Sequence, residues 1–199
     1  TSIILPDGGY NLSTANIGLK VIKVNQAVCG NSSERYTSST ASAVKTFQRT
    51  HGLGVTGIVD ITTWKAMGYS EYDWYNLGTY RTPIKVFNGA TREYRINAML
   101  QTAAEYASAG TKYKVGCSGT PGTYVDCSGL IYQCLYAAGI NPASNIVDHA
   151  LAIYEYTSAN LAADNRLGIE VASYDLQPGD LVFYAKNGKS SVCHIAIYA

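Results

Sequence analysis

The spacing of hydrophobic residues changes along this chain, and that change most constrains its fold. In the first third of the chain, and again near its middle, apolar residues recur every three or four positions, as in amphipathic helices. Towards the C-terminus they fall in short runs typical of strands. Residues 69–90 follow neither spacing and are rich in Tyr, Trp, Pro and Gly. We therefore expect two folded domains, residues 1–68 and 91–199, joined by an aromatic linker whose rings dock on both.

The first domain is expected to be a three-helix bundle. The helical pattern covers residues 16–30, 40–52 and 60–68, with Asn16 and Asp60 as N-cap residues. Three short helices bury little area each, so we expect them to share a single core. The side chains expected in that core are Val21, Val44, Phe47, Leu53, Val55 and Trp64.

Two helices are expected at the start of the second domain. The first covers residues 92–109, with Thr91 as its N-cap. Its buried face is expected to contain Ile96, Met99, Leu100, Ala103 and Ala107. The second helix covers residues 127–138 and is capped by Asp126 or Ser128.

Strands are expected after these helices. Apolar runs at residues 169–172, 181–184 and 192–198 predict three of them, with the turn-forming pair Asn187-Gly188 between the last two. Helices followed by an antiparallel sheet predict an α+β fold for the second domain.

Composition excludes several classes of function. The 199 residues include 15 basic and 14 acidic side chains, so the chain lacks the positive charge of a nucleic-acid-binding protein. No apolar run is long enough to span a membrane. The chain starts at Thr1 without a leader, so we expect any targeting segment to have been removed or never included. The five cysteines form no C-x-x-C pair, and we therefore expect neither a metal nor another cofactor. We expect a monomer with at least one free thiol.

Cys127 stands where a reactive thiol is favoured. The start of a helix supplies partial positive charge and free N–H groups, which stabilise a thiolate. A nucleophilic thiol also needs a base, and His194 is the only histidine in the strand region, on a strand able to lie against this helix. Alternation along that strand would place His194 and Cys193 on opposite faces. Taken alone, these residues also fit a buried thiol and a structural histidine.

Three motifs favour a catalytic over a structural role for Cys127 and His194. In order and spacing they resemble the NlpC-type cell-wall cysteine peptidases. They are DCSGL at residues 126–130, LQPGDLVF at residues 176–183 and HIAIY at residues 194–198. The resemblance covers roughly residues 92–199. It implies a papain-like, circularly permuted fold in which Cys127 attacks a peptide carbonyl and His194 takes the thiol proton.

A second resemblance covers about residues 15–68. The segments AVKTFQ, HGL, GIVD and TW, which start at residues 43, 51, 57 and 63, resemble the three-helix peptidoglycan-binding module. Two modules that both resemble wall-directed families imply one partner, bacterial peptidoglycan. They also imply that the protein is secreted or associated with the cell wall.

The resemblance assigns further residues to the substrate site. Tyr113, in the pattern G-x-x-Y-x-x-G at residues 110–116, matches a family tyrosine that positions substrate or donates to the oxyanion. Asp126 and Ser128 match residues that receive the free amine of the terminal L-Ala in members that cut beside γ-linked D-Glu. For Asp126, a helix-capping role remains equally open, since one carboxylate could do both.

The chain departs from the family pattern in two places. Val115 and Cys117 stand where the family often has an aromatic residue and a glycine, so the pocket wall is altered. The residue that orients the catalytic histidine normally follows it by about a dozen positions, beyond Ala199. We expect the peptidase domain to be truncated at its C-terminus, and hence weak or inactive, unless Asn187 or Asp180 takes that role.

The function implied is that of a peptidoglycan hydrolase, most specifically a γ-D-glutamyl-diamino acid endopeptidase. An N-acetylmuramoyl-L-alanine amidase and a non-catalytic wall-binding protein are the alternatives. The remaining cysteines and histidines are expected to be structural. We expect buried thiols at Cys29 and Cys134 and surface or helix-cap histidines at His51 and His149. Whether Cys117 and Cys193 form a disulfide stays open.

Overall fold

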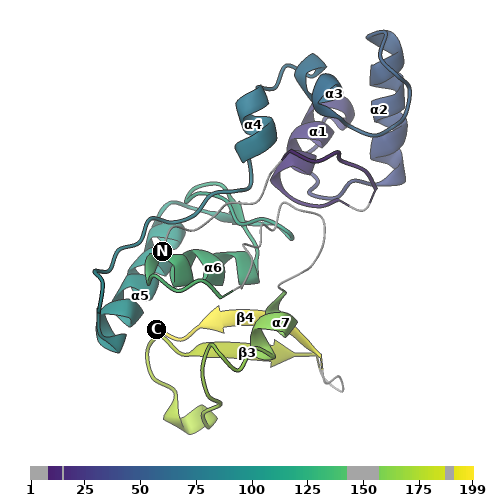
Figure 1. Cartoon of the computed structure of the whole chain (residues 1–199). Helices are drawn as coiled ribbons and strands as arrows, with labels where there is room; N and C mark the ends of the chain where they lie inside the picture. Colours follow the sequence, from purple (N-terminus) through teal and green to yellow (C-terminus); the bar gives the residue numbers. More distant parts are fainter. Residues whose placement is uncertain (1–8, 15, 143–156, 187–190) are drawn as a thin grey trace. The chain divides into compact units, whose positions relative to one another are not determined.

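The computed structural model describes residues 9–14, 16–142, 157–186 and 191–199 (Figure 1). Contacts between residues divide the chain into two compact units. Unit 1 comprises Thr1–Tyr80, Lys114–Cys117 and Asp148–Ile153, and unit 2 comprises Arg81–Tyr113, Ser118–Val147 and Tyr154–Ala199.

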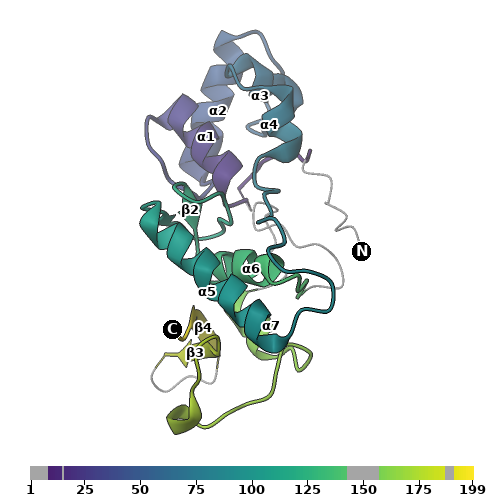
Figure 2. The same cartoon turned by 90° about the vertical axis from the view of Figure 1, so that its left-hand side faces the viewer.

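Unit 1 is helical in the residues described. Its helices are α1 (Leu19–Cys29), α2 (Ser38–Thr50), α3 (Ile61–Ala66) and α4 (Glu71–Asn76). Helix α1 packs against α2, and α3 packs against α4 (Figure 2). The core between them contains Leu12, Val21, Val24, Tyr36, Val44, Val59, Trp64 and Trp74.

The first helix begins later than the sequence predicts. Its N-cap is Gly18 rather than Asn16, and no side chain caps it. Ile17 forms an isolated antiparallel bridge with Arg35, so the backbone at that point is paired in extended form. The side-chain oxygen of Asn16 does not cap the helix but accepts a hydrogen bond from the Ser13 N–H. By contrast, Asp60 caps α3 as predicted, since its carboxylate accepts from the Thr63 N–H at 2.7 Å.

The predicted core of unit 1 is right for Val21, Val44 and Trp64 and wrong for Val55, while Phe47 and Leu53 are only half-buried and lie outside the core cluster. Val21, Val44 and Trp64 are buried, but Val55 is 45% exposed. The amide of Gln48 explains this, because its oxygen accepts the N–H groups of both Thr56 and Gly57 and so shapes a tight turn. That turn places Val59 rather than Val55 in the core.

The aromatic stretch after residue 68 begins with a helix that the sequence did not predict. Ser70 caps α4 by accepting the Asp73 N–H at 3.0 Å. Trp74 is 3% exposed and its ring lies 5.7 Å from that of Trp64, while the Trp64 indole donates to the Ser70 carbonyl at 2.8 Å. A six-residue helix is too short to show a hydrophobic period, and for this reason the pattern resembled a linker.

Unit 2 combines helices with two small sheets. The helices are α5 (Arg92–Ser108), α6 (Cys127–Ala137) and α7 (Ser158–Ala162), with a 3-10 turn η1 at Ser173–Asp175. The strands are β1 (Lys112–Tyr113), β2 (Tyr124–Val125), β3 (Leu181–Ala185) and β4 (Val192–Ile197). Strands β1 and β2 are parallel, whereas β3 and β4 are antiparallel. Helix α6 packs against α5, and both α6 and α7 pack against β4 (Figure 1).

Two sequence expectations for unit 2 are wrong. No strand forms at residues 169–172, where Ile169 is 89% exposed, because an apolar run without a pairing partner is not held as a strand. The buried stripe of α5 consists of Ala98, Met99, Thr102 and Tyr106, and Ala107 is exposed. Thr102 and Tyr106 can be buried because their hydroxyls donate to the carbonyls of Ala98 and Gly119. The Asn187-Gly188 turn lies outside the described residues.

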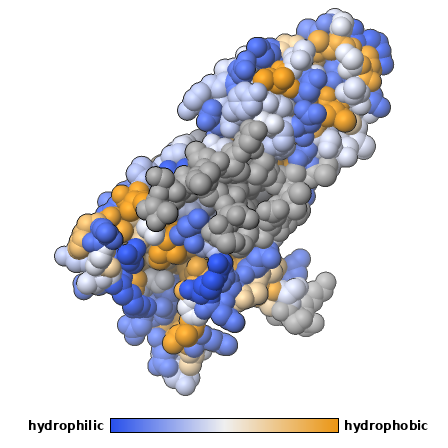
Figure 3. Space-filling model, in the orientation of Figure 1, coloured by the Kyte–Doolittle hydropathy of each residue, from blue (hydrophilic) through white to orange (hydrophobic). Residues whose placement is uncertain are grey.

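On the face shown in Figure 3, hydrophobic residues form separate patches among hydrophilic ones. Among the described residues, no helix has both the length and the apolar character that crossing a membrane requires.

Candidate active site

Two short parallel strands bring Tyr113 to the start of α6. Tyr113 of β1 lies opposite Val125 of β2. Because parallel strands end at the same edge, the chain leaves β2 beside Tyr113 and continues into Asp126 and Cys127. The Tyr113 hydroxyl lies near both Cys127 and Asp126. The structure therefore brings three of the predicted site residues together.

The surroundings of Tyr113 keep its hydroxyl protonated. Partial burial raises the pKa of Tyr113 to about 12, and the neighbouring acidic groups of Cys127 and Asp126 add to the effect. The residue is nonetheless 59% exposed, so its ring lies at the surface of the site. At neutral pH this side chain is a hydrogen-bond donor beside the Cys127 thiol.

Cys127 is the first residue of α6, and Asp126 is the N-cap. One carboxylate oxygen of Asp126 accepts the Gly129 N–H at 2.7 Å and the Ser128 hydroxyl at 3.2 Å. The cap is therefore Asp126, and Ser128 supports it. The thiol of Cys127 is half-buried at the positive end of the helix dipole, near the N–H groups that have no partner within the helix.

His194 lies on β4, which packs against α6. Its imidazole is exposed, and its ring lies 5.7 Å from the ring of Tyr184 on β3. In the part of the chain that the structure describes, no hydrogen bond joins this imidazole to the Cys127 thiol. Such bonds are often long before substrate binds. The two residues thus lie on elements that pack together.

The predicted alternation of side chains around His194 is wrong at one point. Tyr184 pairs with His194, but the next residue, Ala185, pairs with Val192, so Cys193 is an extra residue on β4. Strict alternation is broken there, and both Cys193 and His194 are exposed. Ile195 is 2% exposed and anchors the strand on the buried side.

Two parts of the chain match known protein families. Residues 23–67 match a putative peptidoglycan binding domain, and residues 110–199 match the NlpC/P60 family. The chain carries a peptidoglycan-binding domain followed by an NlpC/P60 domain. Members of the NlpC/P60 family are cysteine peptidases with a papain-like fold, and the mixture of helices and sheet in unit 2 is consistent with it. No curated protein and no solved structure matches the chain.

A buried polar network holds α6 of the NlpC/P60 domain. The Gln133 amide nitrogen donates to the Ser118 hydroxyl at 2.8 Å, and its oxygen accepts the Thr82 N–H at 2.8 Å. Ser118 in turn donates to the carbonyl of Gly129 at 3.1 Å, in the first turn of α6. Gln133 is fully buried. Sequence patterning missed this network because its members are polar, and the only signal was a glutamine inside an apolar helix.

The second motif of the NlpC/P60 domain shapes the entry into β3. The Asp180 carboxylate accepts the Gln177 N–H at 2.8 Å and lies 3.5 Å from Arg92. Gly179 has a φ of +96°, and a Cβ there would lie 2.7 Å from the side chain of Ile96 on α5. The turn thus joins the sheet to α5. Asp180 makes these contacts rather than one to His194, and Asn187 lies outside the described residues.

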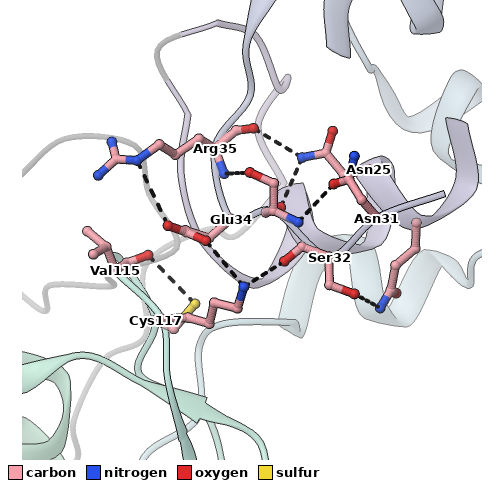
Figure 4. A network of polar contacts seen from close by, with 10 residues as sticks. Asn25, Asn31, Ser32, Glu34, Arg35, Val115 and Cys117 are labelled. Carbon is pink, nitrogen blue, oxygen red and sulfur yellow. Dashed lines mark hydrogen bonds and ion pairs between the residues drawn. The ribbon is translucent and has the colours of Figure 1, made fainter. Parts of the chain in front are cut away.

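Val115 and Cys117, the two residues that depart from the family pattern, lie in the segment Lys114–Cys117 of unit 1. Figure 4 shows them near Ser32 and Glu34. The Lys114 ammonium donates to the Ser32 carbonyl at 3.0 Å and lies 3.5 Å from Glu34. Gly116 has a φ of +75°, and a Cβ there would lie 2.6 Å from the Ile17 side chain. These contacts give a packing reason for the last glycine of the G-x-x-Y-x-x-G pattern.

The other cysteines and histidines have ordinary surroundings. Cys117 and Cys193 form no disulfide with each other. Burial raises the pKa of Cys134 to about 12, which makes it a poor nucleophile, whereas Cys29 is half-buried rather than buried. His51 caps the end of α2, with its Nδ1 2.9 Å from the Phe47 carbonyl. His149 lies outside the described residues.

Proposed function

We propose that this protein is a peptidoglycan hydrolase that cleaves stem peptides, with Cys127 as nucleophile and His194 as base. The observation that carries the proposal is the meeting of Tyr113, Asp126 and Cys127 at the start of α6. A half-buried thiol, a hydrogen-bond donor and a helix N-terminus together suit acyl transfer. The circularly permuted papain-like fold that the resemblance implies belongs to the same proposal.

In the proposed reaction, His194 takes the proton of the Cys127 thiol as the sulfur attacks the carbonyl carbon of the scissile amide. The negative charge moves to the carbonyl oxygen, where N–H groups at the start of α6 stabilise it. The protonated Tyr113 hydroxyl is a further donor. His194 then protonates the leaving amine, and water hydrolyses the thioester to free the acid and the thiol.

The substrate preference is assigned to Asp126 and Ser128. Stem peptides trimmed at the lactyl amide begin with a free L-Ala amine, which is positively charged at neutral pH. Asp126 supplies a carboxylate beside Cys127, and a carboxylate has enough acceptor sites for both the helix cap and one substrate amine. We therefore assign cleavage to the bond between γ-D-glutamate and the diamino acid.

The remaining assignments concern the whole chain. We assign anchoring to peptidoglycan to residues 1–68 and the chemistry to residues 91–199. Residues 69–90 link the two, although helix α4 at their start packs in the core of unit 1. The protein works as a monomer, secreted or attached to the cell wall. The match of residues 23–67 to a peptidoglycan-binding domain supports the anchoring role.

Mass spectrometry of digested muropeptides tests the proposed bond. The expected products are L-Ala-γ-D-Glu dipeptides and fragments with a new amino group on the diamino acid. Release of intact stem peptides from muramic acid would instead identify an amidase. If the wild-type protein binds walls but releases nothing, the protein is a wall-binding module. Cys29→Ala, a change of a half-buried thiol in unit 1, is the control for removal of a cysteine elsewhere.

A further inference from the structure

The strand that carries His194 has an irregularity directly beside it. The register shift between β3 and β4 leaves Cys193 without an opposite residue, while Tyr184 stays opposite His194. An extra residue of this kind is a β-bulge, and bulges often redirect a neighbouring side chain. The bulge therefore lies where it affects the direction of the imidazole.

Two contacts hold this irregular pair of strands together. The Cys193 thiol donates to the Tyr184 carbonyl, with 3.5 Å between sulfur and oxygen. The Tyr184 and His194 rings lie 5.7 Å apart at an angle of 43°, a usual geometry for an attractive ring contact. Tyr184 thus contacts both residues of β4 at the bulge, one through its backbone and one through its ring.

His194 has no other side-chain partner among the described residues. Asp180, a side chain that could have oriented it, is bound to Gln177 and Arg92. The orientation of the imidazole then depends on the strand backbone and on the Tyr184 ring.

We propose that Tyr184 and Cys193 are positioning residues that hold the His194 imidazole in the direction needed for catalysis. The proposal rests on the proposed function, because it requires His194 to be the base. The Tyr184 ring limits rotation of the imidazole from one side. The Cys193 thiol holds the backbone of the bulge, from which the imidazole projects. A displaced base costs rate rather than substrate affinity.

Paired substitutions in the full-length protein separate this role from general stability. Tyr184→Leu removes the ring and Tyr184→Phe keeps it. Cys193→Val removes the donor and Cys193→Ser keeps one. Tyr174→Leu is the matched control, because Tyr174 is 88% exposed in the same unit. The measurements are kcat and KM on a stem peptide, the melting temperature, and the NMR resonances of the His194 ring, assigned with His194→Gln.

We expect Tyr184→Leu and Cys193→Val to lower kcat by roughly 10- to 100-fold at unchanged KM and melting temperature. Both should shift the His194 ring resonances, whereas Tyr184→Phe, Cys193→Ser and Tyr174→Leu should match wild type. If Tyr184→Leu and Cys193→Val keep both kcat and the resonances, the proposal is overturned. If the wild-type protein cleaves no stem peptide, the proposed function fails, and the resonances still decide whether these contacts hold the imidazole.

Discussion

At the scale of single residues, the site depends on which groups lie next to the Cys127 thiol. The Tyr113 hydroxyl lies near Cys127, and Asp126 caps the helix that Cys127 begins. Both contacts follow from the β1–β2 pairing, since it aligns residue 113 with the residues just before the nucleophile.

Tyr113→Phe should lower kcat by about 10- to 100-fold, because it removes a donor to the developing oxyanion. KM and the melting temperature should change little, since Tyr113 is 59% exposed and the ring is kept. Because the pKa of Tyr113 is raised to about 12, the hydroxyl remains a donor throughout the range from pH 6 to about pH 10. The ratio of wild-type to variant rates should therefore be constant over that range. Full activity of the Phe variant would remove Tyr113 from the site.

Asp126→Asn separates substrate binding from helix capping. Asparagine caps a helix about as well as aspartate, so the melting temperature should be unchanged. If the carboxylate also receives the substrate amine, losing that charge-assisted bond costs about 1.5–3 kcal/mol, a loss of about 10- to 150-fold in rate. The measurement is the ratio of cleavage rates for a stem peptide with a free L-Ala amine and the same peptide acetylated. A variant that keeps the wild-type preference would leave Asp126 as a cap alone.

Among the elements, the LQPGDLVF motif at residues 176–183 packs the sheet against α5, and the stability of variants tests this role. Gly179→Ala should lower the free energy of unfolding by about 1–3 kcal/mol, because the added methyl group meets Ile96 and the positive φ is strained. Two alanine substitutions are controls. Gly110 has a positive φ but open space, and Gly168 has open space without the positive φ. Denaturant unfolding should rank the losses as Gly179, then Gly110, then Gly168, and equal losses at all three would contradict the packing role.

The sequence predicted the elements better than the contacts that position them. Long periodic helices such as α2 and α6 were found, as were β3 and β4, because their patterns persist over many residues. Helix α4 was missed because six residues are too few for a period. The strand at 169–172 was predicted from its apolar residues, although only a pairing partner makes such a run a strand.

For the candidate site, the motifs indicated Cys127, and the capping pattern indicated Asp126. The bulge at Cys193 and the Gln133 network could not be predicted from residue patterns. Each of them depends on pairing between strands or on polar atoms meeting in a buried interior.

At the scale of the whole molecule, the first unit extends beyond the family match, which ends at residue 67. Trp74 of α4 belongs to its core and contacts Trp64. Trp74→Ala should therefore lower the free energy of unfolding of this unit by about 3–5 kcal/mol. Tyr72→Ala, on the exposed side of the same helix, should change it by less than about 0.5 kcal/mol. Equal effects in chemical denaturation would place α4 outside the unit's core.

In the proposed function, anchoring and cleavage belong to different parts of one chain, with Cys127 as the nucleophile. The most direct measurement compares wild type with Cys127→Ala on insoluble peptidoglycan, following both co-sedimentation and the release of soluble fragments. We expect Cys127→Ala to sediment with the wall as wild type does and to release no fragments. Fragment release by Cys127→Ala at the wild-type rate would show that another group carries out the reaction.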